Sequence, residues 1–126
     1  MIVIDSDVLI EILEKKSEKG NQAFKLIIES GEEFFITAIA LHEVLYGLRK
    51  HEKSTRDLLF LPVLSYSKKD AVLSSKIELE AEKEGNLIQR TDAMIAAITM
   101  NNEGKLYTFN QRHFNPMKSS GLKLFV

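Results

Sequence analysis

The segment Ile-Val-Ile-Asp-Ser-Asp-Val-Leu-Ile, residues 2–10, decides the fold class. Its first three residues are β-branched and do not alternate with polar residues, which is typical of a parallel strand covered on both faces. The chain then meets an acid, Asp5, and continues with apolar residues at helical spacing from Val8 to Leu13. We therefore expect a central strand at 2–4 and a helix over 8–13, with Asp5 at the junction between them.

The rest of the chain repeats this alternation of short apolar runs and helical patterns. Thr37 and Thr91 are the expected N-caps of two of the helices, and Gly85 is an expected helix stop. The segment 58–64 is compatible with a strand or with a helix end. We expect helices at 23–28, after Thr37, at 71–84 and at 92–100, and strands at 34–36, 106–109 and 122–125. Strands alternating with helices predict an α/β sandwich with a mainly parallel sheet.

Composition narrows the class of protein. A chain of 126 residues with 44% hydrophobic content suits one domain, residues 1–126, with a core of its own. Cysteine is absent, which excludes zinc ribbons, thiol catalysis and a disulfide framework. The net charge of −1 provides no global basic field for nucleic acid. No apolar run approaches the length of a membrane span, so we expect a soluble, cytoplasmic protein.

Polar side chains recur where the predicted strands end. Asp5 follows the first strand, Glu43 lies in the helix after the second, Asp92 opens its helix, and Asn110 follows the strand 106–109. Sites in parallel α/β sheets form beyond the carboxyl ends of the strands, so all four residues can face one edge. The two aspartates can also be explained without a functional role, because aspartate commonly caps helices and is favoured in their first turn. Asp7 fits the role of a cap or of a supporting partner better than that of a ligand.

Glu43 and Asp92 suggest a metal site. Glu43 shares a helix face with Ile39 and Tyr46, opposite an apolar stripe, and Asp92 heads a helix that is apolar all round. A carboxylate that is poorly solvated needs a cation or an Arg or Lys partner. With oxygen ligands only, Mg²⁺ or Mn²⁺ is favoured over Zn²⁺, and such ions serve phosphodiester hydrolysis. His42, His51 and His113 are candidate general bases, although single histidines are more often structural.

Four segments resemble the motifs of PIN-domain ribonucleases, and especially of VapC-type toxins. The first is the opening segment 2–10, and the second is Thr-Ala-Ile-Ala-Leu-His-Glu-Val-Leu-Tyr-Gly at 37–47. The third is Gly-Asn-Leu-Ile from Gly85 with Thr-Asp-Ala-Met-Ile-Ala-Ala at 91–97. The closing one is Thr-Phe-Asn-Gln-Arg-His-Phe at 108–114 followed by Gly-Leu-Lys-Leu from Gly121. Together they span essentially the whole chain in the family's order.

The resemblance implies a three-layer α/β/α fold and Mg²⁺- or Mn²⁺-dependent endonucleolytic cleavage of RNA, with Asp5, Glu43 and Asp92 as the acidic triad. It also implies homodimerisation and, for toxins, inhibition by a small cognate antitoxin. Family members commonly carry a fourth acid at the position of Asn110 or of His113, and this chain has a carboxylate at neither. Asn110 can still orient water or ligate through its amide oxygen, so we keep it as a site residue.

Two other functions compete with this interpretation. A PIN-like domain with an incomplete acidic site could bind RNA or a protein partner without cleaving anything. The segment Asp5-Ser-Asp7 also resembles the start of haloacid-dehalogenase-type phosphatases, but the late segment lacks the paired acids which that family needs. An assay of RNA cleavage with and without Mn²⁺ distinguishes a nuclease from a domain that only binds RNA or protein. Turnover of a small phosphomonoester would identify a phosphatase.

Overall fold

The computed structural model describes residues 1–126 and places a parallel sheet at the centre of the molecule. Its four strands lie in the order β3-β2-β1-β4. They span Ile2–Ile4 (β1), Phe34–Thr37 (β2), Val63–Leu64 (β3) and Lys105–Tyr107 (β4). Because every strand runs in the same direction, all of their carboxyl ends lie at one edge of the sheet.

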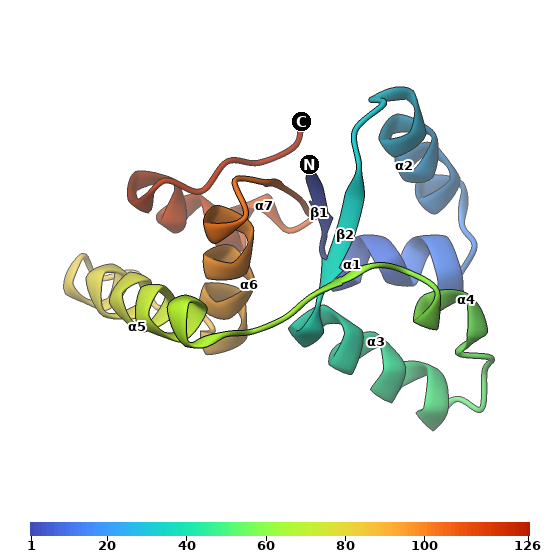
Figure 1. The fold of residues 1–126 in the computed structure, drawn as a ribbon, viewed down its shortest axis with the longest axis horizontal. Coiled ribbons are helices and arrows are strands. Elements are labelled where there is room, and N and C mark those ends of the chain that lie inside the picture. The colour runs from blue at the N-terminus through green and yellow to red at the C-terminus, as the bar shows by residue number, and fades with distance from the viewer.

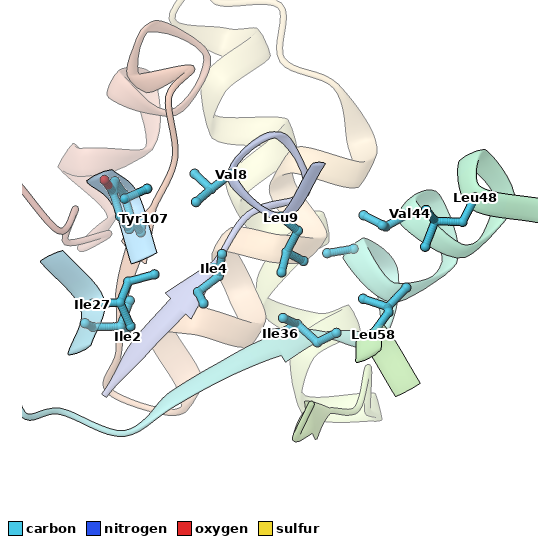
Figure 2. Close-up of a cluster of buried hydrophobic side chains, with 12 residues drawn as sticks. Ile2, Ile4, Val8, Leu9, Ile27, Ile36, Val44, Leu48, Leu58 and Tyr107 are labelled. Carbon is cyan, nitrogen blue, oxygen red and sulfur yellow. The ribbon is translucent and has the colours of Figure 1, made fainter. Parts of the chain in front are cut away.

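Side chains alternate across β1 although all three of its residues are apolar. Ile2 and Ile4 enter one buried cluster, and Val3 enters the other. The first cluster, shown in Figure 2, fills the space between the sheet and the helices of the N-terminal half. These helices are α1 (Ser6–Leu9), the π-helical turn η1 (Ile10–Glu14), α2 (Glu18–Glu29), α3 (Ala38–Lys50) and α4 (Arg56–Leu59). The strand is therefore covered on both faces, as its sequence predicts.

The second cluster packs the C-terminal helices on the opposite face of the sheet. These are α5 (Lys68–Lys83), α6 (Arg90–Asn101), α7 (Gln111–Phe114) and the 3₁₀ turn η2 (Asn115–Ser120). Figure 1 shows α5, α6 and α7 on one side of the strands and α1 to α4 on the other. The predicted three-layer α/β/α sandwich is confirmed. None of the helices is both long and apolar enough to cross a membrane.

The predicted helix at 8–13 differs from the structure, which starts a short α-helix at Ser6 and widens it into η1. The N–H of Lys15 donates to the carbonyl of Ile10, five residues earlier, as in a π-helix. The backbone of η1 lies against Gly20 in α2, where a Cβ atom would collide with the carbonyl oxygen of Glu11. Only glycine allows this close approach. Sequence periodicity misses the wider turn because it is set by packing on α2.

Two other predictions about local structure are wrong. Thr91 does not cap its helix, because α6 already begins at Arg90 behind an extended Gln89. The segment 122–125 makes one parallel bridge, between Leu106 and Leu124, and no strand. The edge strand β4 is short, so only the backbone of Leu106 pairs with this segment. The strand expected at 106–109 is shifted to Lys105–Tyr107, so Thr108 lies beyond its end. The other expected helices and strands are present, and the N–H of Ala40 donates a hydrogen bond to the side-chain oxygen of the N-cap Thr37 at 3.0 Å.

Candidate active site

Asp5 is the centre of the candidate site and directly follows β1. Its backbone is extended and forms the N-cap of α1. One carboxylate oxygen accepts a hydrogen bond from the N–H of Ser6 at 2.9 Å, and the other accepts one from the hydroxyl of Thr108 at 2.9 Å. The residue is only 6% exposed. Each oxygen keeps a further lone pair, because a carboxylate has about four acceptor positions in all.

Thr108 connects the two strand ends that form the site, although no sequence motif marked it as a site residue. It follows β4 as Asp5 follows β1, and its buried hydroxyl also lies 3.4 Å from a carboxylate oxygen of Asp7. The same hydroxyl accepts a hydrogen bond from the N–H of Asn110 at 3.0 Å. The predicted strand 106–109 contained Thr108, whereas β4 ends at Tyr107, and this difference hid the position of Thr108 at the strand end.

Asp7 supports the site, in the role of a cap or supporting partner that its sequence position predicts. One carboxylate oxygen accepts a hydrogen bond from the N–H of Val8 at 2.8 Å, and the other accepts one from the N–H of Phe109 at 3.0 Å. Asp7 therefore ties the first turn of α1 to the segment that follows β4. Its carboxylate also adds negative charge beside Asp5.

Burial raises the pKa values of both Asp5 and Asp7. Burial, followed by the charge of Asp7, raises the pKa of Asp5 from its ordinary 3.8 to about 7, although hydrogen bonds from Thr108 and Ser6 oppose the rise. Burial also raises the pKa of Asp7, against the opposing effect of its backbone hydrogen bonds. Both carboxylates are therefore held where their ionised forms are disfavoured.

Asp92 reaches the same edge from the other helical layer. It lies in the first turn of α6, and its side chain is 15% exposed. Burial raises the pKa of Asp92, the imidazole of His113 lowers it, and the charge of Asp7 raises it further. His113 Nδ1 lies 3.8 Å from a carboxylate oxygen of Asp92. The expectation that α6 is buried on all sides is confirmed over Ile95–Thr99. The packing of this helix therefore fixes the position of Asp92 in its first turn.

Glu43 lies at the rim of the site rather than on a buried face. The residue is exposed on α3, and Tyr46 on the same face is 63% exposed, so the prediction of a poorly solvated face is wrong there. Helical spacing identifies residues that share a face, but whether another element covers that face is decided by packing. Neighbouring residues partly shield the Glu43 carboxylate from water, and this desolvation raises its pKa. A hydrogen bond with the side chain of Ser6 opposes the rise, and the charge of Asp92 adds to it.

Asn110 is exposed and precedes α7 without donating or accepting a capping bond through its side chain. It lines a pocket of about 490 Å³ together with Asp92. The structure thus brings Asp5, Glu43 and Asp92 to one edge, where the charge of Asp92 raises the pKa of both Asp5 and Glu43. It places Asn110 on the side of Asp92. His42 and His51 are exposed on α3 and at its end.

The donor chemistry at this edge fits a hard divalent cation. No Lys or Arg forms an ion pair with Asp5, Asp7, Glu43 or Asp92. The nearby basic groups are two imidazoles, since His113 lies close to Asp92 and the charge of His42 lowers the pKa of Glu43. Buried carboxylates that repel one another and lack a cationic side chain are stabilised by a metal ion. The side chains do not converge into a ready group of three ligands for one ion. A cation held here would therefore keep several waters, as Mg²⁺ commonly does.

The sequence is similar to a known family and to a characterised protein. Residues 2–117 match the family model described as PIN domain. A curated relative, ribonuclease VapC1 from Methanocaldococcus jannaschii, is 28% identical over 129 residues, which cover 98% of this chain and 86% of the relative.

Several solved structures share this fold. VapBC2 from Rickettsia felis, bound to a DNA fragment from its promoter, aligns with a TM-score of 0.79 at 22% identity, covering 99% of this chain and 98% of the other. A toxin-antitoxin complex from Klebsiella pneumoniae aligns with a TM-score of 0.73 at 22% identity, covering 91% of each chain. At these identities the likeness shows a shared fold.

Proposed function

This chain belongs to the PIN domain family, and we propose that it is an endoribonuclease that hydrolyses RNA phosphodiester bonds with Mg²⁺ or Mn²⁺. The observation that carries the proposal is the set of uncompensated carboxylates at the carboxyl edge of the sheet, with Asp5 buried and held at a pKa of about 7. The curated ribonuclease relative supports RNA as the substrate. The family assignment also removes the phosphatase alternative.

Asp5 and Asp92, assisted by Glu43, are the residues that would hold the metal. When bound, the ion would supply a lowered pKa for a ligated water and neutralise charge on the phosphate. The chain itself orients Asp5, since the hydrogen bonds from Ser6 and Thr108 hold one oxygen each. Asp7 and Thr108 are positioning residues that keep the ends of β1 and β4 at a constant separation.

Asn110 would act beside Asp92, where it lines the same pocket. Its amide can orient a water or ligate through its oxygen, but it brings no negative charge. A site with one charge fewer binds a divalent cation less tightly than a site with four acids. We therefore propose weaker metal binding at this side of the site, with catalysis retained through Asp5, Glu43 and Asp92.

We also propose that the protein is the toxin of a toxin-antitoxin pair, acts in the cytoplasm as a homodimer and is inhibited by a small cognate antitoxin. The support is the fold shared with VapBC assemblies and with a toxin-antitoxin complex. Expression of the wild type should arrest growth of a bacterial host, while Asp5→Asn should not. Equal toxicity of both proteins would refute the role of Asp5.

The decisive experiment is cleavage of a single-stranded RNA pool by the purified protein. Wild type should cleave with Mn²⁺ or Mg²⁺, and chelator should stop the reaction. Asp5→Asn and Asp92→Asn should be inactive, whereas Asp57→Asn, at an exposed acid on α4, should cleave like wild type. RNA binding without any metal-dependent cleavage would show instead that the domain has become a binding module.

A further inference from the structure

The pocket that contains Asp92 and Asn110 extends well beyond these two residues. Its other walls come from the connection between α5 and α6 and from α7 and η2, and they comprise Leu87, Ile88, Gln89, Arg112, His113 and Pro116. The volume of about 490 Å³ lies within the range of roughly 300–1,000 Å³ that is usual for ligand sites. Most of this space is not needed to hold a metal ion, so it can receive part of the substrate.

Leu87 is the most unusual residue of this pocket. Its side chain is 93% exposed, which is more than any other large apolar side chain of the protein. A single exposed leucine is ordinary, but this one lies in a pocket with two further nonpolar residues, Ile88 and Pro116. An apolar wall next to a cluster of acids offers a surface on which the face of a nucleobase can pack.

Helix α7 contributes a cationic side chain, Arg112, to this pocket. Arg112 lines the pocket, is exposed and makes no ion pair within the chain, so its guanidinium can turn to an incoming anion. Arginine donates hydrogen bonds to two phosphate oxygens at once. Gln89 adds an amide, which can both donate to and accept from the edge of a base. One pocket therefore combines an apolar wall, a cation and an amide beside the proposed reacting centre.

We propose that this pocket is a nucleotide subsite, which holds the nucleotide next to the bond that is cut. The base packs on Leu87 and Ile88 with its edge toward Gln89, and Arg112 binds the phosphate that follows it. The inference rests on the proposed function, because it takes single-stranded RNA as the ligand. It assigns the choice of cleavage site to the 85–89 connection, which lies outside the acidic cluster.

Leu87→Ala tests the apolar wall without disturbing the fold, because Leu87 buries almost no surface. Val72→Ala is the matched control, since Val72 is also an exposed aliphatic residue, 64% exposed, and lies on α5 away from the pocket. Cleavage of a random-sequence RNA pool with Mn²⁺ should show a base preference beside the cut. We expect Leu87→Ala to flatten this preference and to raise KM about 5- to 10-fold with kcat within twofold, while Val72→Ala matches wild type.

Binding provides a readout that does not require turnover. Anisotropy of a fluorescein-labelled single-stranded RNA should show 5- to 10-fold weaker binding when Leu87→Ala is added to the Asp5→Asn background. Arg112→Ala in that background should weaken binding to all sequences and reduce the salt dependence by about one phosphate contact. If Leu87→Ala weakens RNA binding but the wild type does not cleave RNA, the subsite is supported and the proposed nuclease activity is refuted.

Three results would overturn the proposal. The first is an unchanged base preference and KM in Leu87→Ala while wild type cleaves RNA, which would leave the nuclease intact and remove the subsite. The second is RNA binding that Leu87→Ala and Arg112→Ala leave unaltered. The third is a change of oligomeric mass in Leu87→Ala by light scattering, which would show that a second copy of the chain covers Leu87 in solution.

Discussion

Replacing Asp5 with asparagine should stabilise the metal-free protein, and increasingly so as the pH rises. The folded protein keeps a proton on Asp5 up to a pKa of about 7, whereas the unfolded chain loses it near 3.8. Between these values the native state binds more protons, so the contribution of Asp5 to stability falls as pH rises, and above about pH 7 it is fully lost. Asparagine carries no charge at any pH and escapes this loss.

The size of the effect follows from the same shift. Each pKa unit corresponds to about 1.4 kcal/mol, so the rise from 3.8 to about 7 amounts to roughly 4 kcal/mol above pH 7. Rearranging the hydrogen bonds from Ser6 and Thr108 around an amide costs about 1 kcal/mol. We expect Asp5→Asn to be about 3 kcal/mol more stable than wild type at pH 8, and close to wild type or slightly less stable at pH 4.

The assay is urea unfolding of both proteins in chelator at pH 4 and pH 8. The control is Asp57→Asn, because the Asp57 side chain is 67% exposed and its pair with Arg56 is worth little. The control should differ little from wild type at either pH. Destabilisation by Asp5→Asn of equal size at both pH values would refute the reasoning, because it would show that the carboxylate is compensated in the metal-free fold.

Three further predictions concern the metal and the residues around it. Mn²⁺ at 100 times its Kd should increase the free energy of unfolding of wild type by about 2.7 kcal/mol, and thermal melts should show this as a higher melting temperature. Thermal melts of Asp5→Asn and Asp92→Asn should not change when Mn²⁺ is added. Asn110→Asp should tighten Mn²⁺ binding in a titration and also lower the stability of the metal-free protein, because a fourth acid repels the others; no change in either quantity would mean that Asn110 points elsewhere. Thr108→Val should cost roughly 1–3 kcal/mol, because a buried carboxylate loses its O–H donor, and should raise the pKa of Asp5 further. Urea unfolding across pH would then show a steeper loss of stability toward neutral pH, and an unaltered slope would contradict it.

The alternation of elements and the edge position of Asp5, Asp92 and Asn110 could be predicted, because they depend on local patterns. A β-branched run followed by an acid and a helical pattern needs no distant information. The same patterns failed where a neighbouring element decides the outcome. The π-helical turn after Leu9 depends on the approach of α2 at Gly20, and the segment 122–125 finds one free partner residue on β4 rather than a strand.

The sequence by itself determined a parallel α/β fold and the acids that follow its strands, since hydrophobic period and residue type are properties of neighbours along the chain. Only the tertiary structure decided that Thr108 connects Asp5 to Asp7, that Glu43 lies at the rim, and that Leu87 and Arg112 share a pocket with Asp92. These relations join residues far apart in the sequence. They follow from the packing of two helical layers on one sheet, which sets distance, burial and charge together and which no local pattern encodes.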